Sequence, residues 1–255
     1  MYSLPKTLTG NSPQREQRVQ MLLLDRISIK YQRRIAREIT RAMNDMASGP
    51  TTKKQAKHES KMRRILNALW LDSGEAMGKH IGNHEKCIGW YETKKTGGIS
   101  NTLLANTVMR SWIGVYGSEK IVGITDTTRD QVSNIISKGV DEGLSATEVS
   151  KLIRSISAFR GSSRAATITR TETHSAANVA AQATAKAAGV KMRRRWSSAK
   201  NERTRKAHRD ADGQIVGMDE PFRVGGYDLM YPSDYASKAP ASLTINCRCA
   251  VAYIL

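Results

Sequence analysis

The sequence predicts an α+β protein that is mostly helical, in which a helical N-terminal region is followed by a C-terminal module of helices and a small sheet. Aromatic residues form only 5% of the 255 residues, while methionine and alanine are frequent, which favours packed helices over a sandwich or barrel. Apolar residues recur mainly at three- and four-residue intervals over residues 14–47. Beyond Gly189, short mixed stretches alternate with Gly, Pro and Asp turns, as in small sheets.

The N-terminal half is predicted to contain a basic helical hairpin. Apolar spacing predicts a first helix over residues 14–47, which the polar turn at residues 48–52 ends. A second helix is predicted from residue 53 or 55 to about residue 81. Because about five polar residues are enough to reverse the chain, an antiparallel pair is the simplest arrangement.

Two further helices are predicted in the middle of the chain. One covers residues 100–115 and ends at Gly117, and the other starts at the Thr-Asp-Thr-Thr run and covers residues 125–143. We place the domain boundary between them. Residues 1–125 then form a basic helical region, and residues 126–255 form the second domain.

The second domain is predicted to begin with two more helices. Ser145 and Glu148 form a capping box, in which their side chains satisfy the first amides of a short helix over residues 146–158. A Gly-Ser-Ser break at residues 161–163 follows. Residues 165–188 then form an alanine-rich helix that ends at the next glycine and packs closely on a neighbour.

Short strands and loops are predicted to complete the second domain. Residues 191–197, 214–217 and 249–255 are the expected strands of a small sheet, and the last of them closes the module. Helices over residues 126–188 and a sheet with loops over residues 190–255 together make an α+β domain.

The formal net charge of +18 indicates a polyanionic partner. Between Lys186 and Lys206 there are nine basic residues and one acid, Glu202. Such side chains contact phosphates without sequence preference and release counterions. The alternative is a solvated cationic face. The candidate nucleic-acid-binding residues are Lys191, Arg193, Arg194, Arg195, Lys200, Arg203, Arg205 and Lys206.

The chain has no apparent targeting or membrane segment. Its longest early apolar cluster, Met21–Leu24, is followed at once by Asp25 and Arg26. The basic N-terminus lacks the hydrophobic stretch of a signal peptide, which predicts a protein kept in a reducing cytosol. The three cysteines are therefore expected to be thiols or metal ligands rather than disulfides.

Two groups of residues are candidates for a metal site. His208, Cys247 and Cys249, with Asp212 nearby in sequence, carry donors that suit zinc, although C-x-C is not a standard zinc spacing. The alternative is that the cysteines and Asn246 lock the last strand into the core while His208 hydrogen-bonds a loop carbonyl. A second group, His80, His84 and Cys87, has i, i+4 histidines but no accompanying glutamate, so polar residues at a helix end are the alternative.

No arrangement of residues predicts an enzyme. His208, Asp210 and Asp212 could suggest a metal-dependent nuclease, but they do not form a recognisable cluster of carboxylates and histidines. The chain has no Gly-rich phosphate loop, no G-x-S-x-G elbow and no paired-carboxylate spacing. We expect no catalytic residues and no cofactor, zinc excepted.

The C-terminal motifs resemble those of a phage protein family. Read in order as R-x-x-H, D-G, P-F, Y-P and N-C-R-C, with the Thr169–His174 run upstream, they are similar to the Mu protein F-like, or SPP1 gene-7-like, head morphogenesis proteins. The resemblance covers about residues 130–255. The motif residues are Arg205, His208, Asp212, Gly213, Phe222, Pro232, Asn246, Cys247, Arg248 and Cys249.

The resemblance implies a minor capsid protein of a tailed phage, made in the bacterial host and held inside the virion near the portal. Family members bind the portal, assist procapsid assembly, and contact packaged DNA or leave with it during ejection. The expected partners are the portal protein, a major capsid or scaffold protein and double-stranded DNA, with no membrane in the virion-bound state. Residues 1–125 are expected to contact the portal or capsid, and residues 186–206 the DNA.

Two further expectations concern a fused enzyme domain and an alternative function. Some family members carry a toxin enzyme, such as an ADP-ribosyltransferase, after this region. Because the chain ends six residues after Cys249, we expect no such domain here. The alternative function is that of a free nucleic-acid-binding or metal-dependent nucleic-acid-processing protein, for which the same positive charge would serve.

Overall fold

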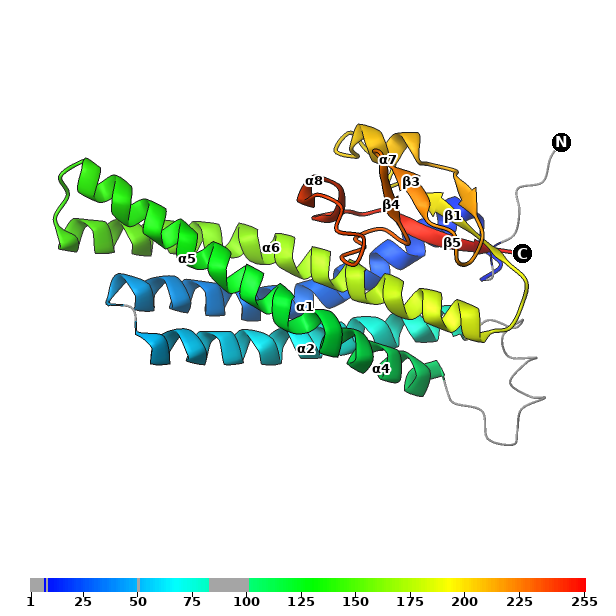
Figure 1. Cartoon of the computed structure of the whole chain (residues 1–255), viewed down its shortest axis with the longest axis horizontal. Helices are drawn as coiled ribbons and strands as arrows, with labels where there is room; N and C mark the ends of the chain where they lie inside the picture. The colour runs from blue at the N-terminus through cyan, green and yellow to red at the C-terminus, as the bar shows by residue number, and fades with distance from the viewer. Residues whose placement is uncertain (1–6, 8, 50, 83–100) are drawn as a thin grey trace. The chain divides into compact units, whose positions relative to one another are not determined.

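The computed structural model describes residues 7, 9–49, 51–82 and 101–255, and it confirms a mostly helical α+β fold (Figure 1). The helical part comprises α1 (Pro13–Ala47), α2 (Thr52–Gly82), α4 (Asn101–Trp112), the π-helical segment η1 (Ile113–Gly117), α5 (Ser118–Asp141) and α6 (Ala146–Ala187). The part that follows comprises β1 (Arg193–Ser197), α7 (Lys206–Asp210), β2 (Ile215–Val216), β3 (Phe222–Val224), β4 (Tyr227–Leu229), α8 (Ala241–Thr244) and β5 (Ala250–Ile254).

The chain divides into two compact units. The first comprises residues 1–27, 70–111 and 170–255, and the second comprises residues 28–69 and 112–169. The boundary predicted after residue 125 falls inside α5, and each unit draws segments from both sides of it. Separate roles for the two halves of the chain stay a prediction.

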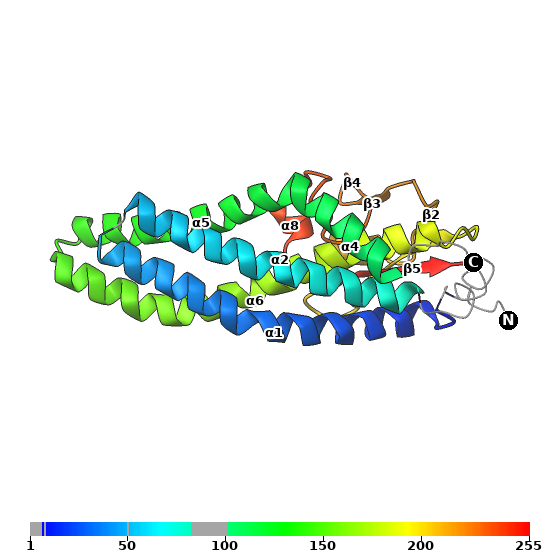
Figure 2. The ribbon, with the colours of Figure 1, turned by 90° about the horizontal axis from the view of Figure 1, so that it is seen from below.

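The second unit is built from segments of α1, α2, α5 and α6, and it contains the predicted helical hairpin. Its parts of α1 and α2 lie side by side in Figures 1 and 2. His58 Nδ1 lies 2.6 Å from Glu38 Oε1, which joins the two helices through a buried polar contact. The buried apolar residues of this pair include Ile35, Ile39, Met43, Met62 and Leu66. Both predicted helices are confirmed.

The predicted break at residues 161–163 is wrong, because α6 is one continuous helix. Gly161 is buried in its interior, where a Cβ atom would lie 2.7 Å from Thr40 Oγ1. A glycine inside a helix is unfavourable by about 1 kcal/mol relative to alanine. Close packing against α1 explains why glycine is found there. The capping box that starts α6 is confirmed, since the Ser145 backbone N–H donates to Glu148 Oε2 over 2.8 Å.

The helix predicted to start at Thr125 begins earlier in the structure, at Ser118, as α5. Gly117 lies within η1 rather than at a helix end, and the helix continues directly into α5. The Thr125 hydroxyl donates to the Val122 carbonyl over 2.9 Å, and Thr128 donates to the Ile124 carbonyl over 3.0 Å. Threonine hydroxyls that bond to the preceding turn are compatible with a helix interior. The threonine-rich run therefore lies inside α5 instead of capping it.

The first unit packs the alanine-rich part of α6 against the C-terminal module. Ala177, Ala181 and Ala185 belong to the same buried cluster as Trp196 and Phe222. Small side chains let neighbouring elements approach closely, which confirms the close packing predicted for this helix. Within the described part of the chain, every helix is too short or too polar to cross a bilayer.

The strands of the first unit form two small antiparallel sheets. One has the order β2-β1-β5, with Arg195 opposite Ala252 in the β1–β5 pair, and the other is the hairpin β3–β4. The predicted strands are confirmed as β1, β2 and β5, although each is shorter than expected. The β3–β4 hairpin was not predicted. Its turn is formed by Gly225 and Gly226, both at positive φ, a conformation that glycine adopts most readily.

Candidate functional site

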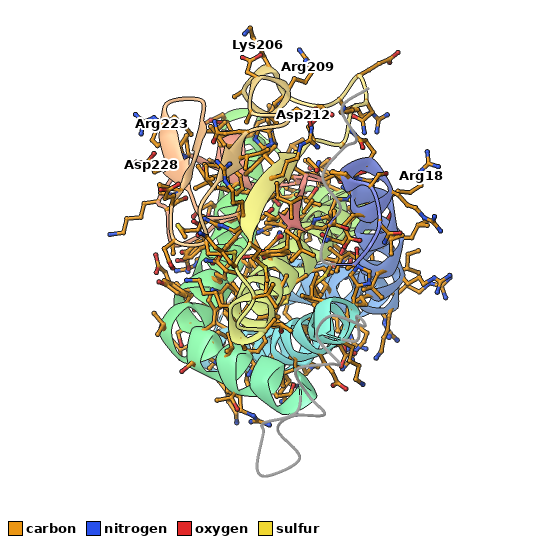
Figure 3. The ribbon with its side chains drawn as sticks, turned by 90° about the vertical axis from the view of Figure 1, so that its right-hand side faces the viewer. Arg18, Lys206, Arg209, Asp212, Arg223 and Asp228 are labelled. Atoms are coloured by element: carbon orange, nitrogen blue, oxygen red, sulfur yellow. The ribbon has the colours of Figure 1, made fainter. Side chains whose placement is uncertain are left out.

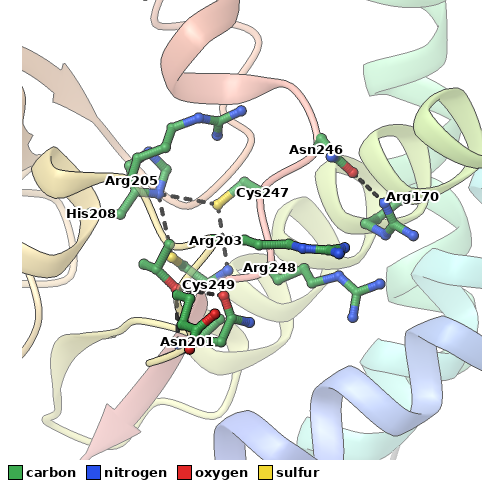
Figure 4. A pocket seen from close by; sticks show the side chains of 12 residues that line it. Arg170, Asn201, Arg203, Arg205, His208, Asn246, Cys247, Arg248 and Cys249 are labelled. Atoms are coloured by element: carbon green, nitrogen blue, oxygen red, sulfur yellow. Dashed lines mark hydrogen bonds between the residues drawn. The ribbon is translucent and has the colours of Figure 1, made fainter.

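A buried histidine and two buried cysteines from distant parts of the chain lie together in the first unit (Figure 4). His208 is carried by the short helix α7, and Arg205 precedes that helix in an extended conformation. Cys247 and Cys249 follow Asn246, whose left-handed backbone (φ 58°) turns the chain inward. His208 and both cysteines are each 2% exposed.

The ring of His208 faces both sulfur atoms. Its Nδ1 atom lies 3.4 Å from Cys247 Sγ and 3.4 Å from Cys249 Sγ. The expected hydrogen bond from His208 to a loop carbonyl is therefore not formed, and its buried Nε2 has no hydrogen-bond partner among the described residues. The two thiols share one buried environment. They lie just before β5, however, and not inside it.

The two cysteines have opposite acid–base behaviour. The hydrogen bond between their side chains lowers the pKa of Cys247 well below its ordinary value, against the opposing effect of burial, and His208 lowers it further. The same hydrogen bond, together with burial, raises the pKa of Cys249. The pair therefore favours one thiolate, on Cys247, next to the imidazole.

The cluster borders a basic cavity of about 480 Å³. The polar residues that line it with the cluster are Arg170, Asn201, Glu202, Arg203, Thr204, Arg205, Asn246 and Arg248. Four of these are arginines and one is an acid, so the cavity has an excess of positive charge. Figure 4 shows Arg203 and Arg248 extending alongside each other near the two cysteines.

Helix α6 holds the N-C-R-C segment through the Thr169–His174 run. The Asn246 backbone N–H donates to Thr171 Oγ1 over 2.9 Å, and the Arg170 guanidinium donates to Asn246 Oδ1. Glu172, two residues after Arg170, accepts a 2.9 Å hydrogen bond from Trp70 Nε1 of α2. The run therefore joins α2, α6 and the C-terminal segment within the first unit.

The remaining motif residues stabilise the loops around the cluster. Asp212 accepts a 2.8 Å hydrogen bond from the Ser198 backbone N–H, and Gly213, at φ 86°, donates to the Trp196 carbonyl. The Phe222 ring packs edge-on against Trp196, with 5.3 Å between centroids. The buried Pro232 accepts a hydrogen bond at its carbonyl from Asn178 of α6. These contacts fix the backbone that carries His208.

Comparison with known proteins places this segment in a phage family. Residues 130–252 match the family described as Phage Mu protein F like protein, and they include both the Thr169–His174 run and the N-C-R-C segment. The minor head protein GP7 of Bacillus phage SPP1 is 37% identical over 95 residues, which are 34% of this chain and 28% of that protein. These two matches support a phage minor head protein family for this segment of the chain.

Two further curated relatives match part of this chain. An NAD(+)–arginine ADP-ribosyltransferase EFV of Enterococcus faecalis is 28% identical over 59% of this chain and 31% of its own length. The uncharacterised protein YqbB of Bacillus subtilis is 27% identical over 57% of this chain and 48% of its own length. The chain thus spans less than half the length of each of these relatives. No solved structure matches it.

The basic stretch between Lys186 and Lys206 does not face solvent throughout. Arg194 is fully buried, so its assignment as a DNA contact is wrong. Its guanidinium donates to the carbonyls of Gly217, Met230 and Glu220 and lies 5.2 Å from the centroid of the Phe222 ring. Arginine is the side chain that can serve several acceptors at once. The sequence does not distinguish Arg194 from the neighbouring Arg193 and Arg195, because the strands packed around it determine its burial.

The other candidates lie at or near the surface of the first unit. Exposed positions are Lys191, Arg193, Lys200, Arg203 and Lys206, and half-buried positions are Arg195 and Arg205. Lys200 pairs with Asp212 over 3.1 Å, and Lys206 pairs with Asp210 over 2.7 Å. In Figure 3, Lys206 and the exposed Arg209 project outward from α7. Sequence reasoning missed Arg209, although it lies next to His208 in the same basic run.

The remaining metal candidates do not form a site among the described residues. Asp210 and Asp212 are paired with lysines and do not join His208 in the buried cluster. His80 Nε2 lies 2.7 Å from Glu16 Oε1, which accounts for that histidine. His84 and Cys87 fall outside the described residues. Only the set of His208, Cys247 and Cys249 brings three such side chains together within the described part of the chain.

Proposed function

We propose that this protein is a minor capsid protein held inside the phage head near the portal, where it aids procapsid assembly and contacts packaged DNA. The observation that carries the proposal is the family match over residues 130–252. A relative is named as a minor head protein, which supports the same role here. The portal, a capsid or scaffold protein and double-stranded DNA are the partners that this role requires.

The distribution of unpaired cations supports contact with DNA. Lys191, Arg193 and Arg203 are exposed and have no acidic partner among the described residues. The formal net charge of +18 leaves an excess of such groups on the molecule as a whole. Phosphates inside a filled phage head would neutralise this charge, and each contact would release counterions.

The position in the head is tested with virions. We expect mass spectrometry of purified virions and procapsids to detect this protein at low copy number, and the portal protein of the same phage to capture it from solution. Alanine substitution of the exposed Arg33, Arg34 and Arg37 in the full chain tests whether residues 1–125 carry the portal contact. Absence from both particles would contradict the proposal.

The DNA contact is tested by salt dependence. Replacing Lys191, Arg193 and Arg203 by alanine should reduce the slope of log affinity against log salt by up to about 2.7, since each phosphate contact contributes about 0.9. The matched control replaces three lysines that already pair with aspartates, and it should change the slope less. These control positions are Lys186, Lys200 and Lys206. Equal slopes for all three proteins would remove this surface from the DNA contact.

We further propose that the protein is a structural component without catalytic turnover. The ADP-ribosyltransferase relative is matched over only 31% of its length, and the two aspartates near His208 are paired with lysines. Supercoiled plasmid should stay intact with Mg²⁺, Mn²⁺ or Zn²⁺, and NAD⁺ should not be consumed in the presence of an arginine acceptor. Plasmid cleavage that His208→Ala abolishes would instead support the nucleic-acid-processing alternative.

A further inference from the structure

We propose that His208, Cys247 and Cys249 bind one zinc ion, with a fourth coordination position open to the arginine-lined cavity. Imidazole nitrogen and thiolate sulfur are the donors that zinc prefers in proteins. This inference rests on the geometry of the buried cluster and does not depend on the proposed role in the phage head.

The distances fit a tetrahedral ion. With Zn–N of about 2.05 Å and Zn–S of about 2.3 Å, the edges of a tetrahedron are about 3.6 Å between nitrogen and sulfur and about 3.8 Å between the two sulfurs. Nδ1 of His208 lies 3.4 Å from each sulfur. All three donor atoms lie within 4.8 Å of one another. Shifts of less than about 1 Å would therefore complete the geometry.

Hydrogen bonding explains the arrangement less well than a metal does. One imidazole nitrogen either donates or accepts a single strong hydrogen bond, yet Nδ1 faces two sulfurs at equal distance. An ion between the three atoms satisfies all of them at once. The Cys249 backbone N–H also points to Cys247 Sγ over 3.4 Å, and such outer hydrogen bonds orient a metal-bound thiolate.

The site is held in place by the surrounding backbone. The Asn246 N–H is bonded to Thr171 of α6, and the carbonyl of Ile245 accepts a 2.6 Å hydrogen bond from Arg205. The Gln17 side chain of α1 donates to the carbonyl of Arg248, which lies between the two cysteines. These contacts position the cysteines beside α7 independently of an ion. A preformed cluster binds a metal with little loss of chain entropy.

Charge balance favours this ion with these ligands. Zn²⁺ bound by two thiolates and a neutral imidazole forms a centre with no net charge, and any protons that these ligands carry before binding are released to solvent. A neutral centre can lie beside Arg203 and Arg248, where an unneutralised divalent cation would be repelled. Because all three donors line the cavity, water or an anion can reach the fourth position.

The proposal is tested first on the full wild-type chain. Elemental analysis after purification under reducing conditions and dialysis should find about one zinc per chain. X-ray absorption at the zinc edge should give two sulfur neighbours at about 2.3 Å and two nitrogen or oxygen neighbours at about 2.0 Å. Cobalt exchanged into the site should show the thiolate charge-transfer band and the intense visible bands of a tetrahedral ion.

Single substitutions then identify the ligands. Cys247→Ser, Cys249→Ser and His208→Ala should each weaken zinc affinity by more than about a hundredfold. Loss of a residue that only hydrogen-bonds to a metal ligand already weakens metal affinity by about ten- to hundredfold. The matched control is His58→Asn, which alters a buried histidine of the second unit. This control should keep about one zinc per chain even if it lowers the melting temperature.

Chelation keeps the test decisive if the ligand variants fail to fold. Removing zinc from the wild-type protein with a chelator should lower its melting temperature, and added Zn²⁺ should restore it. Reduced wild-type protein that contains no zinc, takes up no cobalt and melts identically with and without chelator would overturn the proposal. Zinc with no sulfur neighbours, or zinc retained by both cysteine variants, would overturn it as well.

Discussion

Arg194 has a structural role that the sequence around it does not predict. Arg194→Ala should lower the free energy of unfolding by about 2–4 kcal/mol, because three carbonyls lose their donor and a buried side chain leaves a cavity. Arg194→Lys should recover less than half of this loss, since an ammonium group lacks the planar fork. Denaturant unfolding measures both.

The control for that measurement is the preceding residue. Arg193 is exposed, so Arg193→Ala should change the unfolding free energy by less than about 0.5 kcal/mol. Similar losses for the two alanine variants would show that the buried guanidinium does not hold the loops together.

His174 should make the protein less stable in mild acid. Burial, reinforced by Arg248 and Arg170, lowers the pKa of His174 to about 3, and neither ring nitrogen has a hydrogen-bond partner among the described residues. In the unfolded chain its pKa is about 6.5, so between these values only the unfolded state takes up the proton. Stability from this residue is therefore present above pH 6.5 and is lost as the pH falls towards 3.

The size of this effect can be measured directly. Between pH 7 and pH 5 the contribution of His174 should fall by about 2 kcal/mol, because each unit of pKa difference corresponds to about 1.4 kcal/mol. Urea unfolding at both pH values should show this fall in the wild type. In His174→Asn the difference between the two pH values should shrink by the same amount. An undiminished difference would mean that His174 titrates normally in the folded protein.

At the level of the elements, Gly161 permits α6 to pass close to α1 in the second unit. Gly161→Ala should destabilise the protein although alanine is the better helix former by about 1 kcal/mol, because the added methyl group would meet Thr40 Oγ1 at 2.7 Å. In a Thr40→Ala background the same change should become neutral or stabilising. A double-mutant cycle by denaturant unfolding measures the difference.

Helix α5 offers a matched glycine for comparison. Gly123 also lies within a helix, and a Cβ atom there would meet nothing within 4 Å. Gly123→Ala should therefore raise the unfolding free energy by about 0.5–1 kcal/mol. If both glycine substitutions stabilised the protein, close helix packing would not be the reason for Gly161.

At the scale of the molecule, the last strand joins the two ends of the chain within the first unit. Every residue of β5 is buried; the strand pairs with β1, and Ile254 also bridges to Thr7 near the N-terminus. Truncation before Asn246 should remove the cooperative unfolding of this unit and the near-ultraviolet circular dichroism signal of the buried Trp196. Deleting only Leu255, which is 42% exposed, should leave both unchanged. A normally melting truncated protein would contradict this view of β5.

Much of the fold was predictable because its signals are local. The capping box at Ser145, the apolar spacing of α1 and α2, and the glycine after α6 each depend on residues a few positions apart. The failures were local signals that packing overrode. Gly161 was predicted to break a helix, and the Thr125 run was predicted to start one, yet both lie in helix interiors.

The candidate site was predictable in its residues but not in its geometry. The sequence by itself determined the helical class, the positions of β1, β2 and β5, the family motifs and the choice of His208, Cys247 and Cys249 as candidate ligands. Only the tertiary structure decided that one imidazole nitrogen faces both sulfurs, that Arg194 is buried among carbonyls, and that arginines line the cavity beside the cluster. The physical reason is that burial and side-chain partners depend on segments far apart in the chain, whereas periodicity, caps and motifs are read within one segment.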